Sequence, residues 1–296
     1  MKRLYRVFTV ILILGLLSIC SLGAEAATRP LSIFVSILPQ RYFVQRIAGS
    51  TAQVSVMVRP GADPVTYEPS PRQMAELAGA QAYLRIGVPF EEAWLGKIKK
   101  SYPGLAIIDT RQGITLRHIE GHHHEQDQGH ESGDMAMDPH IWLSPRLVKR
   151  QAETIYKTLV ALNPSQKEAY TENYREFTQD LEKVDQEIGS IIGDGQGRKF
   201  LVFHPAWGYF ADEYGLCQIP IEVAGKEPTA KELAQTIDLA RRENIKVIFV
   251  QSQFDTKPAE AVARAVGGKV VQIDPLAEDY LANLVAIAKA IAAGAR

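Results

Sequence analysis

The sequence predicts an α/β protein with two Rossmann-like lobes, each built on a mainly parallel sheet, joined by a long rigid backbone helix. Three observations predict this class. Short apolar runs alternate with helical patterns over residues 31–108, the same alternation restarts at residue 199, and one long apolar stripe lies between the two regions. Strands that alternate with helices form parallel sheets through right-handed crossovers. The 296 residues are enough for two domains of ordinary size.

Residues 1–26 have the pattern of a secretory signal peptide. Basic residues at positions 2, 3 and 6 precede the short apolar run Val10–Leu17, and Ala24-Glu25-Ala26 has the small-x-small form of a cleavage site. The run is shorter than the roughly 20 apolar residues of a membrane-spanning helix. Cys20 could carry a lipid anchor, but Ile19 before it suits that processing poorly. We therefore expect a periplasmic protein without a lipid anchor.

The first lobe is expected over residues 27–143. Its predicted strands are runs of apolar residues, many of them β-branched: Leu31–Ile37, Val54–Val58, Ala82–Ile86 and Leu105–Ile108. Helical patterns between them include Arg72–Ala80 and Glu91–Lys100. Gly113–Asp138 breaks the alternation, because it is polar and holds five of the seven histidines without apolar periodicity. We call residues 113–138 the His-rich loop and expect it to be mobile.

Residues 144–194 are expected to link the lobes as helices. Pro145–Leu162 is one segment, and Asn163-Pro164 offers an N-cap and a first residue for the next. From Pro164 to Ile192, apolar residues recur at alternating spacings of four and three, which is one helical stripe. Such a helix runs about 43 Å, a length that suits a connection between lobes. A coiled-coil dimer is the alternative, but the heptad pattern is short and isolated, so we expect a monomer.

The second lobe is expected over residues 195–296. Its predicted strands are Lys199–Phe203, Gln218–Glu222, Lys246–Val250 and Lys269–Ile273, and its predicted helices are Trp207–Gly215, Thr229–Asn244, Lys257–Val266 and Glu278–Ala293. Cys217 would be the only cysteine after cleavage, so no disulfide framework is expected, and its apolar neighbours predict a buried side chain.

The charge of the chain excludes some partners. Its formal net charge is -1, and no block of five or more like charges occurs. Nucleic acids and anionic membrane surfaces attract proteins with strong positive patches, so we expect neither as a partner.

Three side chains at strand ends and before the linking helices predict a metal site. His204 directly follows one predicted strand and Asp274 another, while His140 precedes the helical region. In open parallel sheets, ligands bind beyond the carboxyl ends of the strands. Two imidazoles and a carboxylate suit Zn²⁺, and they also admit Mn²⁺, Fe²⁺ or Co²⁺. Each residue alone is more often a surface or capping residue, so the prediction depends on their joint placement.

The His-rich loop is a second signal for metal. It contains closely spaced histidines among acidic residues: His118, His122, His123, His124 and His130. Clustered imidazoles on a flexible segment collect Zn²⁺ or Cu²⁺ weakly. A solvated insertion without a role is the alternative.

Several sequence blocks resemble those of a known family. They are Arg59-Pro60-Gly61-Ala62-Asp63-Pro64, Tyr67-Glu68-Pro69-Ser70-Pro71, Asp138-Pro139-His140-Ile141-Trp142-Leu143-Ser144-Pro145, Phe203-His204-Pro205-Ala206-Trp207-Gly208-Tyr209-Phe210 and Ile273-Asp274-Pro275-Leu276. In this order they resemble the metal-binding solute-binding proteins of zinc and manganese ABC importers, and the His-rich loop resembles that of the zinc branch. The resemblance implies two α/β lobes joined by a rigid helix, and a membrane permease as partner.

The resemblance also implies a ligand set. His140 and His204 match two histidine ligands of the family, and Asp274 matches its carboxylate ligand. The remaining ligand is a histidine in Asp-Pro-His-x-Tyr-Glu-Pro, where this chain has Val65. Water, Glu68 or Asp63, or a histidine of the loop would complete a site that lacks it.

We therefore expect extracytoplasmic capture of a divalent metal, zinc before manganese, by a binding protein that is not an enzyme. Two alternatives stay open. One is a solute-binding protein for a metal chelate or another solute, with Trp142, Trp207, Tyr209 and Arg59 lining its cleft. The other is a metallohydrolase, since three ligands leave a position for water. No His-Glu-x-x-His motif supports the latter.

Overall fold

The structure is a computed structural model that describes residues 29–119, 136–222 and 226–294. The predicted signal peptide and His122, His123, His124 and His130 lie outside the described residues. Contacts divide the chain into Met1–Pro30 and a compact unit, Leu31–Arg296, which is the subject below. Among the described residues, no helix combines the length and the apolarity that crossing a membrane requires.

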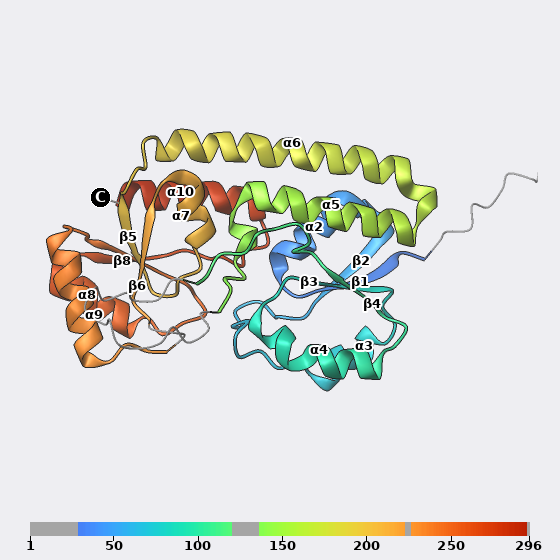
Figure 1. The fold of residues 1–296 in the computed structure, drawn as a ribbon, viewed down its shortest axis with the longest axis horizontal. Helices are drawn as coiled ribbons and strands as arrows, with labels where there is room; N and C mark the ends of the chain where they lie inside the picture. The colour runs from blue at the N-terminus through green and yellow to red at the C-terminus, as the bar shows by residue number, and fades with distance from the viewer. Residues whose placement is uncertain (1–28, 120–135, 223–225, 295–296) are drawn as a thin grey trace, which may run out of the picture. The chain divides into compact units, whose positions relative to one another are not determined.

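The first lobe is a four-stranded parallel sheet with the order β2-β1-β3-β4 (Figure 1). The strands are β1 (Leu31–Val35), β2 (Ala52–Val56), β3 (Ala82–Arg85) and β4 (Ala106–Asp109). The helices are α2 (Leu38–Ala48), α3 (Pro71–Leu77) and α4 (Pro89–Ser101). A capping box between Ser70 and Gln73 fixes the start of α3, with Pro71 as its first residue. All four predicted strands are confirmed, with ends shifted by one or two residues.

Helix α2 was not anticipated from the sequence. Pro39 stands in its first turn, where the missing N–H costs no hydrogen bond. Phe43, Val44 and Ile47 are buried on one of its faces. Their i, i+1, i+4 spacing is the signal that would have identified this helix.

Two long helices follow the His-rich loop: α5 (Pro145–Leu162) and α6 (Lys167–Ile192). Between them, Pro164–Gln166 forms a 3₁₀ turn, and the Asn163 side chain makes no cap hydrogen bond, so the predicted α-helical start at Pro164 is wrong by one turn. Helix α6 packs against α5 and α2 and also against α10 of the second lobe (Figure 1). Its 26 residues span about 39 Å, which lets one helix contact both lobes.

The second lobe repeats the architecture, with the parallel order β6-β5-β7-β8. Its strands are β5 (Lys199–Val202), β6 (Cys217–Pro220), β7 (Val247–Val250) and β8 (Lys269–Gln272). Its helices are α7 (Gly208–Tyr214), α8 (Ala230–Arg242), α9 (Lys257–Val266) and α10 (Tyr280–Gly294). Gly215 ends α7 in the left-handed region at φ 71°, a conformation that costs glycine little.

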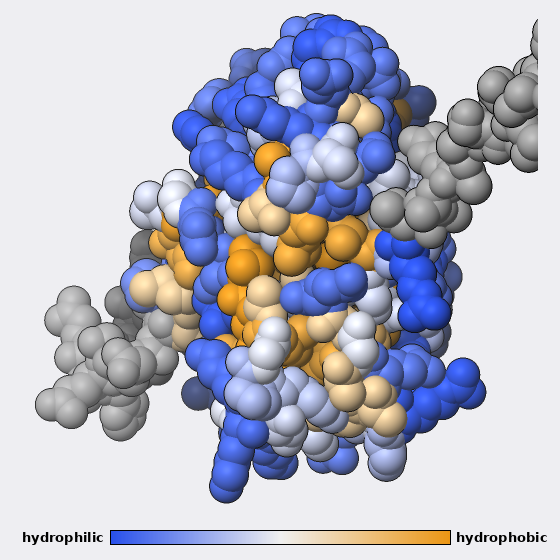
Figure 2. All heavy atoms as spheres, turned by 90° about the vertical axis from the view of Figure 1, so that its right-hand side faces the viewer, coloured by the Kyte–Doolittle hydropathy of each residue, from blue (hydrophilic) through white to orange (hydrophobic). Residues whose placement is uncertain are grey.

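One hydrophobic core runs through both lobes. It includes residues from the first sheet, the inner faces of α5 and α6, and α7 and α10 of the second lobe. A smaller core lies under α8 and α9. Figure 2 shows the first-lobe end of the protein, where hydrophobic residues gather at the centre and hydrophilic residues surround them. The shared core makes α6 a rigid connection between the sheets.

Cys217 corrects one prediction. It was expected to be buried, but its side chain is exposed. It begins β6, the edge strand of the second sheet, where side chains alternate between the two faces. The apolar neighbours Leu216 and Ile219 misled the prediction. In β6 the buried positions are Gln218 and Pro220, so period-two alternation places Cys217 with Ile219 on the more exposed face.

Candidate metal centre

His140 and His204 meet in the structure. His140 precedes the 3₁₀ turn Ile141–Leu143, and His204 lies two residues beyond the end of β5. Their Nε2 atoms are 3.3 Å apart, and each residue is only 8% exposed. Two side chains 64 positions apart in sequence therefore point the same ring nitrogen at one spot.

Each imidazole is held from behind by a buried carboxylate. The Nδ1 of His140 lies 2.7 Å from Oδ1 of Asp138, which also accepts the His140 backbone N–H at 3.0 Å. The Nδ1 of His204 lies 2.7 Å from Oε1 of Glu222. A carboxylate acceptor places the proton on Nδ1 and leaves a lone pair on Nε2. Both histidines are thus presented as Nε2 ligands.

The spacing of the two Nε2 atoms fits a shared ion. Nitrogen ligands lie about 2.0–2.1 Å from Zn²⁺, and at a tetrahedral angle two of them are about 3.3–3.4 Å apart. Without a cation, two lone pairs facing each other at 3.3 Å repel. Metal binding turns this repulsion into coordination.

Burial favours the metal-binding form of His140. Desolvation lowers the pKa of His140 below its usual value, and the Asp138 carboxylate opposes this shift. The neutral imidazole, which alone can bind a metal, therefore persists to a lower pH than in a solvated histidine.

Neighbouring side chains fix both rings. The Gln251 side chain donates to the backbone carbonyl of His204 at 3.0 Å and lies 3.4 Å from its N–H. Phe254 stacks on the His204 ring with centroids 5.0 Å apart, and Trp142 packs on His140 at 5.1 Å. Gln251 therefore holds in place the backbone of the loop that carries His204.

The two histidines line a cavity of about 700 Å³. Asp63 and Val65 belong to the same wall, and Val65 is 45% exposed. The Asp63 carboxylate accepts the Val65 N–H at 2.9 Å, which holds this turn in place. Val65 therefore occupies the cavity wall at the position where the resemblance expects a histidine. Glu68 is exposed and is not among the residues that line the cavity.

Asp274 does not join the two histidines. Its Oδ1 accepts the Leu276 N–H at 2.9 Å and the Gln253 side-chain amide at 3.2 Å. It lines a neighbouring pocket, and Gln253 borders both that pocket and the cavity of the histidines. Within the described residues, no three His, Cys, Asp or Glu side chains are grouped to hold a metal. In this arrangement Asp274 stands apart from the two histidines, because local hydrogen bonds hold its carboxylate in its own turn.

The described ends of the His-rich loop are anchored. His118 and Met137 form an antiparallel bridge, and the Asp138 N–H donates to the Arg117 carbonyl at 2.8 Å. Leu116 and Ile119 line the cavity. Paired backbone groups thus join the two described ends of the loop to each other, while its expected mobility stays a prediction.

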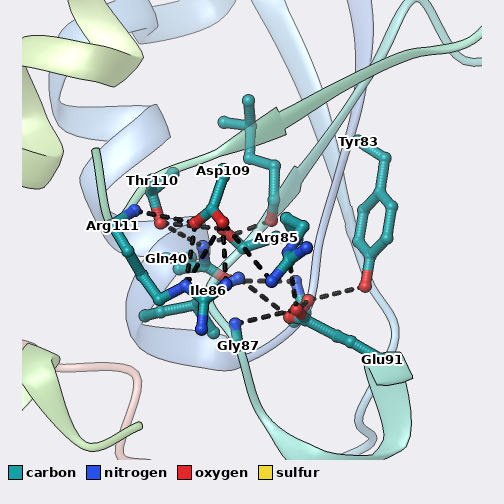
Figure 3. A network of polar contacts seen from close by, with 11 residues as sticks. Gln40, Tyr83, Arg85, Ile86, Gly87, Glu91, Asp109, Thr110 and Arg111 are labelled. Carbon is teal, nitrogen blue, oxygen red and sulfur yellow. Dashed lines mark hydrogen bonds and ion pairs between the residues drawn. The ribbon is translucent and has the colours of Figure 1, made fainter. Parts of the chain in front are cut away.

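A polar network surrounds Gly87 and Arg111, two further residues that line the cavity (Figure 3). The Glu91 carboxylate accepts the N–H groups of Ile86 and Gly87, each at 2.8 Å, and burial raises the pKa of Glu91. Gly87 has φ 93°, and a Cβ there would strike the Arg111 guanidinium, which Asp109 holds. This network sets the Gly87 backbone and Arg111 as fixed parts of the wall.

The two carboxylates behind the histidines were not predicted. Glu222 was assigned to the end of a predicted strand, but β6 ends at Pro220, so Glu222 lies two residues beyond its strand just as His204 lies two residues beyond β5. With the correct strand end, the rule that pointed to His204 would have pointed to this part of the chain as well. Asp138 lies two residues before His140, where an Asp side chain commonly accepts the backbone N–H two positions on. Neither residue was a predicted ligand; each carboxylate lies at hydrogen-bond distance from Nδ1 of one histidine.

Two parallel α/β lobes, a helix buried against both, and a histidine-lined cavity define the class of solute-binding proteins with a rigid connecting helix. The family described as "ZnuA: Zinc-uptake complex component A periplasmic" matches residues 33–294. The chain belongs to this family, whose members are extracytoplasmic binding proteins with a transport role.

Individual relatives agree with this assignment. The high-affinity zinc uptake system protein ZnuA of Bacillus subtilis is 29% identical over 259 residues, covering 86% of this chain and 81% of the relative. A crystal structure of ZnuA superposes with a TM-score of 0.83 at 46% identity, covering 90% of this chain and 99% of that one. A ZnuA deletion mutant with zinc bound gives a TM-score of 0.81 at 47% identity, covering 89% and 97%.

Proposed function

We propose that this protein captures Zn²⁺ outside the cytoplasm and delivers it to the membrane permease of an ABC importer. The observation that carries the proposal is the pair of Nε2 atoms 3.3 Å apart, each imidazole backed by a buried carboxylate. Zinc-bound ZnuA and the zinc uptake protein of Bacillus subtilis support the choice of zinc over manganese.

His140 and His204 are the proposed first two ligands, and Asp274 is the proposed third. Asp274 would reach the ion by releasing the Leu276 N–H and the Gln253 amide. Because Val65 cannot coordinate, water fills the fourth position unless Asp63, Glu68 or a histidine of the loop reaches it. Residues 1–26 are the proposed signal peptide that places the protein in the periplasm, where it acts as a monomer.

A zinc titration tests the function. Residues 27–296 are titrated in competition with a chromophoric chelator, in a variant without residues 120–135 so that His122, His123, His124 and His130 do not contribute. We expect tight binding of one equivalent, and loss of it in both His140→Ala and His204→Ala. His118→Ala is the matched control and should bind as the parent does. Undiminished zinc binding in the double alanine variant would refute the proposed site.

A further inference from the structure

Arg117 is a cation held against α7 by three contacts. Its Nε lies 3.1 Å from the Asp212 carboxylate, and its guanidinium carbon lies 5.9 Å from the centre of the Tyr209 ring. Its backbone N–H donates to the Tyr209 hydroxyl at 3.0 Å. Arg117 belongs to the anchored end of the His-rich loop, so α7 of the second lobe fixes a residue that follows the first sheet.

Gly208, the first residue of α7, makes room for this cation. A Cβ at Gly208 would overlap Nη1 of Arg117 and would lie 2.9 Å from Oδ2 of Asp138. Any larger residue here would displace the guanidinium from the carboxylate. Gly208 therefore permits the approach of the two charges, although its own backbone is ordinary helix.

Asp138 is the carboxylate that Arg117 faces. It is 0% exposed, and its Oδ1 is fully engaged by the backbone and ring of His140. Its Oδ2 has no hydrogen bond among the described residues, and Nη1 of Arg117 lies 3.7 Å from it. The Tyr209 hydroxyl donates to the Asp138 carbonyl at 2.9 Å, which fixes the backbone as well.

A buried carboxylate is stable only with an opposing charge or a full set of hydrogen bonds. Here the hydrogen bonds go to His140, and among the described residues Arg117 is the cation that pairs with the remaining oxygen. Loss of that cation would leave Asp138 free to turn away, and the His140 ring would lose the acceptor that directs its Nε2.

We propose that Arg117 is a positioning residue for zinc capture: seated over Gly208, it holds the Asp138 carboxylate in the orientation that aims His140 at the ion. This inference rests on the proposed function, because it takes His140 as a zinc ligand. It also gives the anchored end of the His-rich loop a role that does not depend on the loop's histidines.

Two independent perturbations test the proposal in the chain without residues 120–135. Arg117→Gln removes the charge, and Gly208→Ala displaces the guanidinium while leaving every charge in place. We expect each to weaken zinc binding by about 10- to 100-fold, the usual effect of losing the group that orients a ligand. Arg117→Lys keeps the charge and should recover most of the affinity.

Matched controls separate positioning from stability. Arg72→Gln removes an exposed arginine, and Gly96→Ala adds a Cβ to a helix position with nothing within 4 Å, so neither should alter zinc binding. Urea unfolding of the metal-free variants reports stability. Long-range ¹H–¹⁵N spectra report whether the His140 proton stays on Nδ1, and we expect that signal to be lost in Arg117→Gln and Gly208→Ala.

The outcomes are distinct. Zinc affinity within twofold of the parent in Arg117→Gln and Gly208→Ala, while His140→Ala abolishes binding, overturns the role of Arg117 and leaves the function standing. Full binding in His140→Ala overturns the function itself. If Arg117→Gln does not fold, the comparison of Gly208→Ala with Arg117→Lys decides, since the proposal requires weaker binding in the former.

Discussion

Glu222 offers a direct measure of how strongly a carboxylate tunes a zinc-binding imidazole. Its Oε1 lies 2.7 Å from Nδ1 of His204, the length of a charge-assisted hydrogen bond, and the residue is 5% exposed. Water screens such a contact poorly, and a hydrogen bond to a charged group contributes about 1.5–3 kcal/mol. If that energy supports the metal-bound ring, Glu222→Ala should weaken zinc binding by about 10- to 100-fold.

A conservative variant divides this effect into two parts. Glu222→Gln keeps an oxygen acceptor for Nδ1–H but removes the charge, so we expect a smaller loss, of about tenfold. Zinc affinity is measured by chelator competition at pH 7.5, and the unfolding of the metal-free protein is measured alongside. Glu243→Gln is the control, because Glu243 pairs with Lys199 in the same lobe without touching either histidine.

Zinc binding by Glu222→Ala within twofold of the parent, while His204→Ala abolishes binding, would refute a tuning role for Glu222. That result would mean that the packing of Phe254 and the Gln251 contacts alone orient the His204 ring. A tuning role for the carboxylate is supported if zinc affinity is lowest in Glu222→Ala, intermediate in Glu222→Gln and highest in the parent.

Three further outcomes are expected. Val65→His should raise zinc affinity by about tenfold or more by adding a nitrogen to the cavity wall; unchanged affinity in the same competition assay contradicts this. Burial raises the pKa of Glu213 from 4.5 to about 7, so between these pH values the folded protein binds more protons than the unfolded chain. The free energy of unfolding therefore falls as pH rises through that window, by at most about 3 kcal/mol. Glu213→Gln should abolish that fall when urea unfolding is measured at pH 5 and pH 7.5. An equal pH dependence of the free energy of unfolding in the variant and the parent would reject this assignment. Phe177→Ala removes a fully buried ring of α6 and should lower the free energy of unfolding by about 3–5 kcal/mol, whereas a loss below about 1 kcal/mol would count against a shared core.

All eight predicted strands appear. The central strands were predictable because strands buried in a parallel sheet are mostly apolar, whereas the edge strands β2, β6 and β8 are more exposed and include polar residues. Helix α2 was missed because its apolar face is short and follows a strand without a polar break. The 3₁₀ turn at Pro164–Gln166 was invisible to periodicity, since one turn of tighter helix barely shifts the apolar stripe.

The two proposed histidine ligands could be predicted from the sequence more readily than the side chains that hold them in position. His140 and His204 stand out in sequence because few residue types bind metals and both fall near the ends of elements. Glu222 contacts His204, which is 18 positions away in the sequence, and Arg117 contacts Asp138, which is 21 positions away. No local sequence pattern indicates contacts over such separations. Asp274 was predicted from its position after a strand, but that position does not indicate which hydrogen bonds its carboxylate makes.

Helix α6 has a consequence for the kinetics of metal exchange. Since one continuous helix packs against helices of both lobes and shares their hydrophobic core, the two halves of the pocket are preassembled before the ion arrives. Arrival then requires little reorganisation of the chain, so the association rate should be fast and differences between metals should appear in residence time. Rapid release of the ion would therefore require an external force, such as a transporter that bends helix α6.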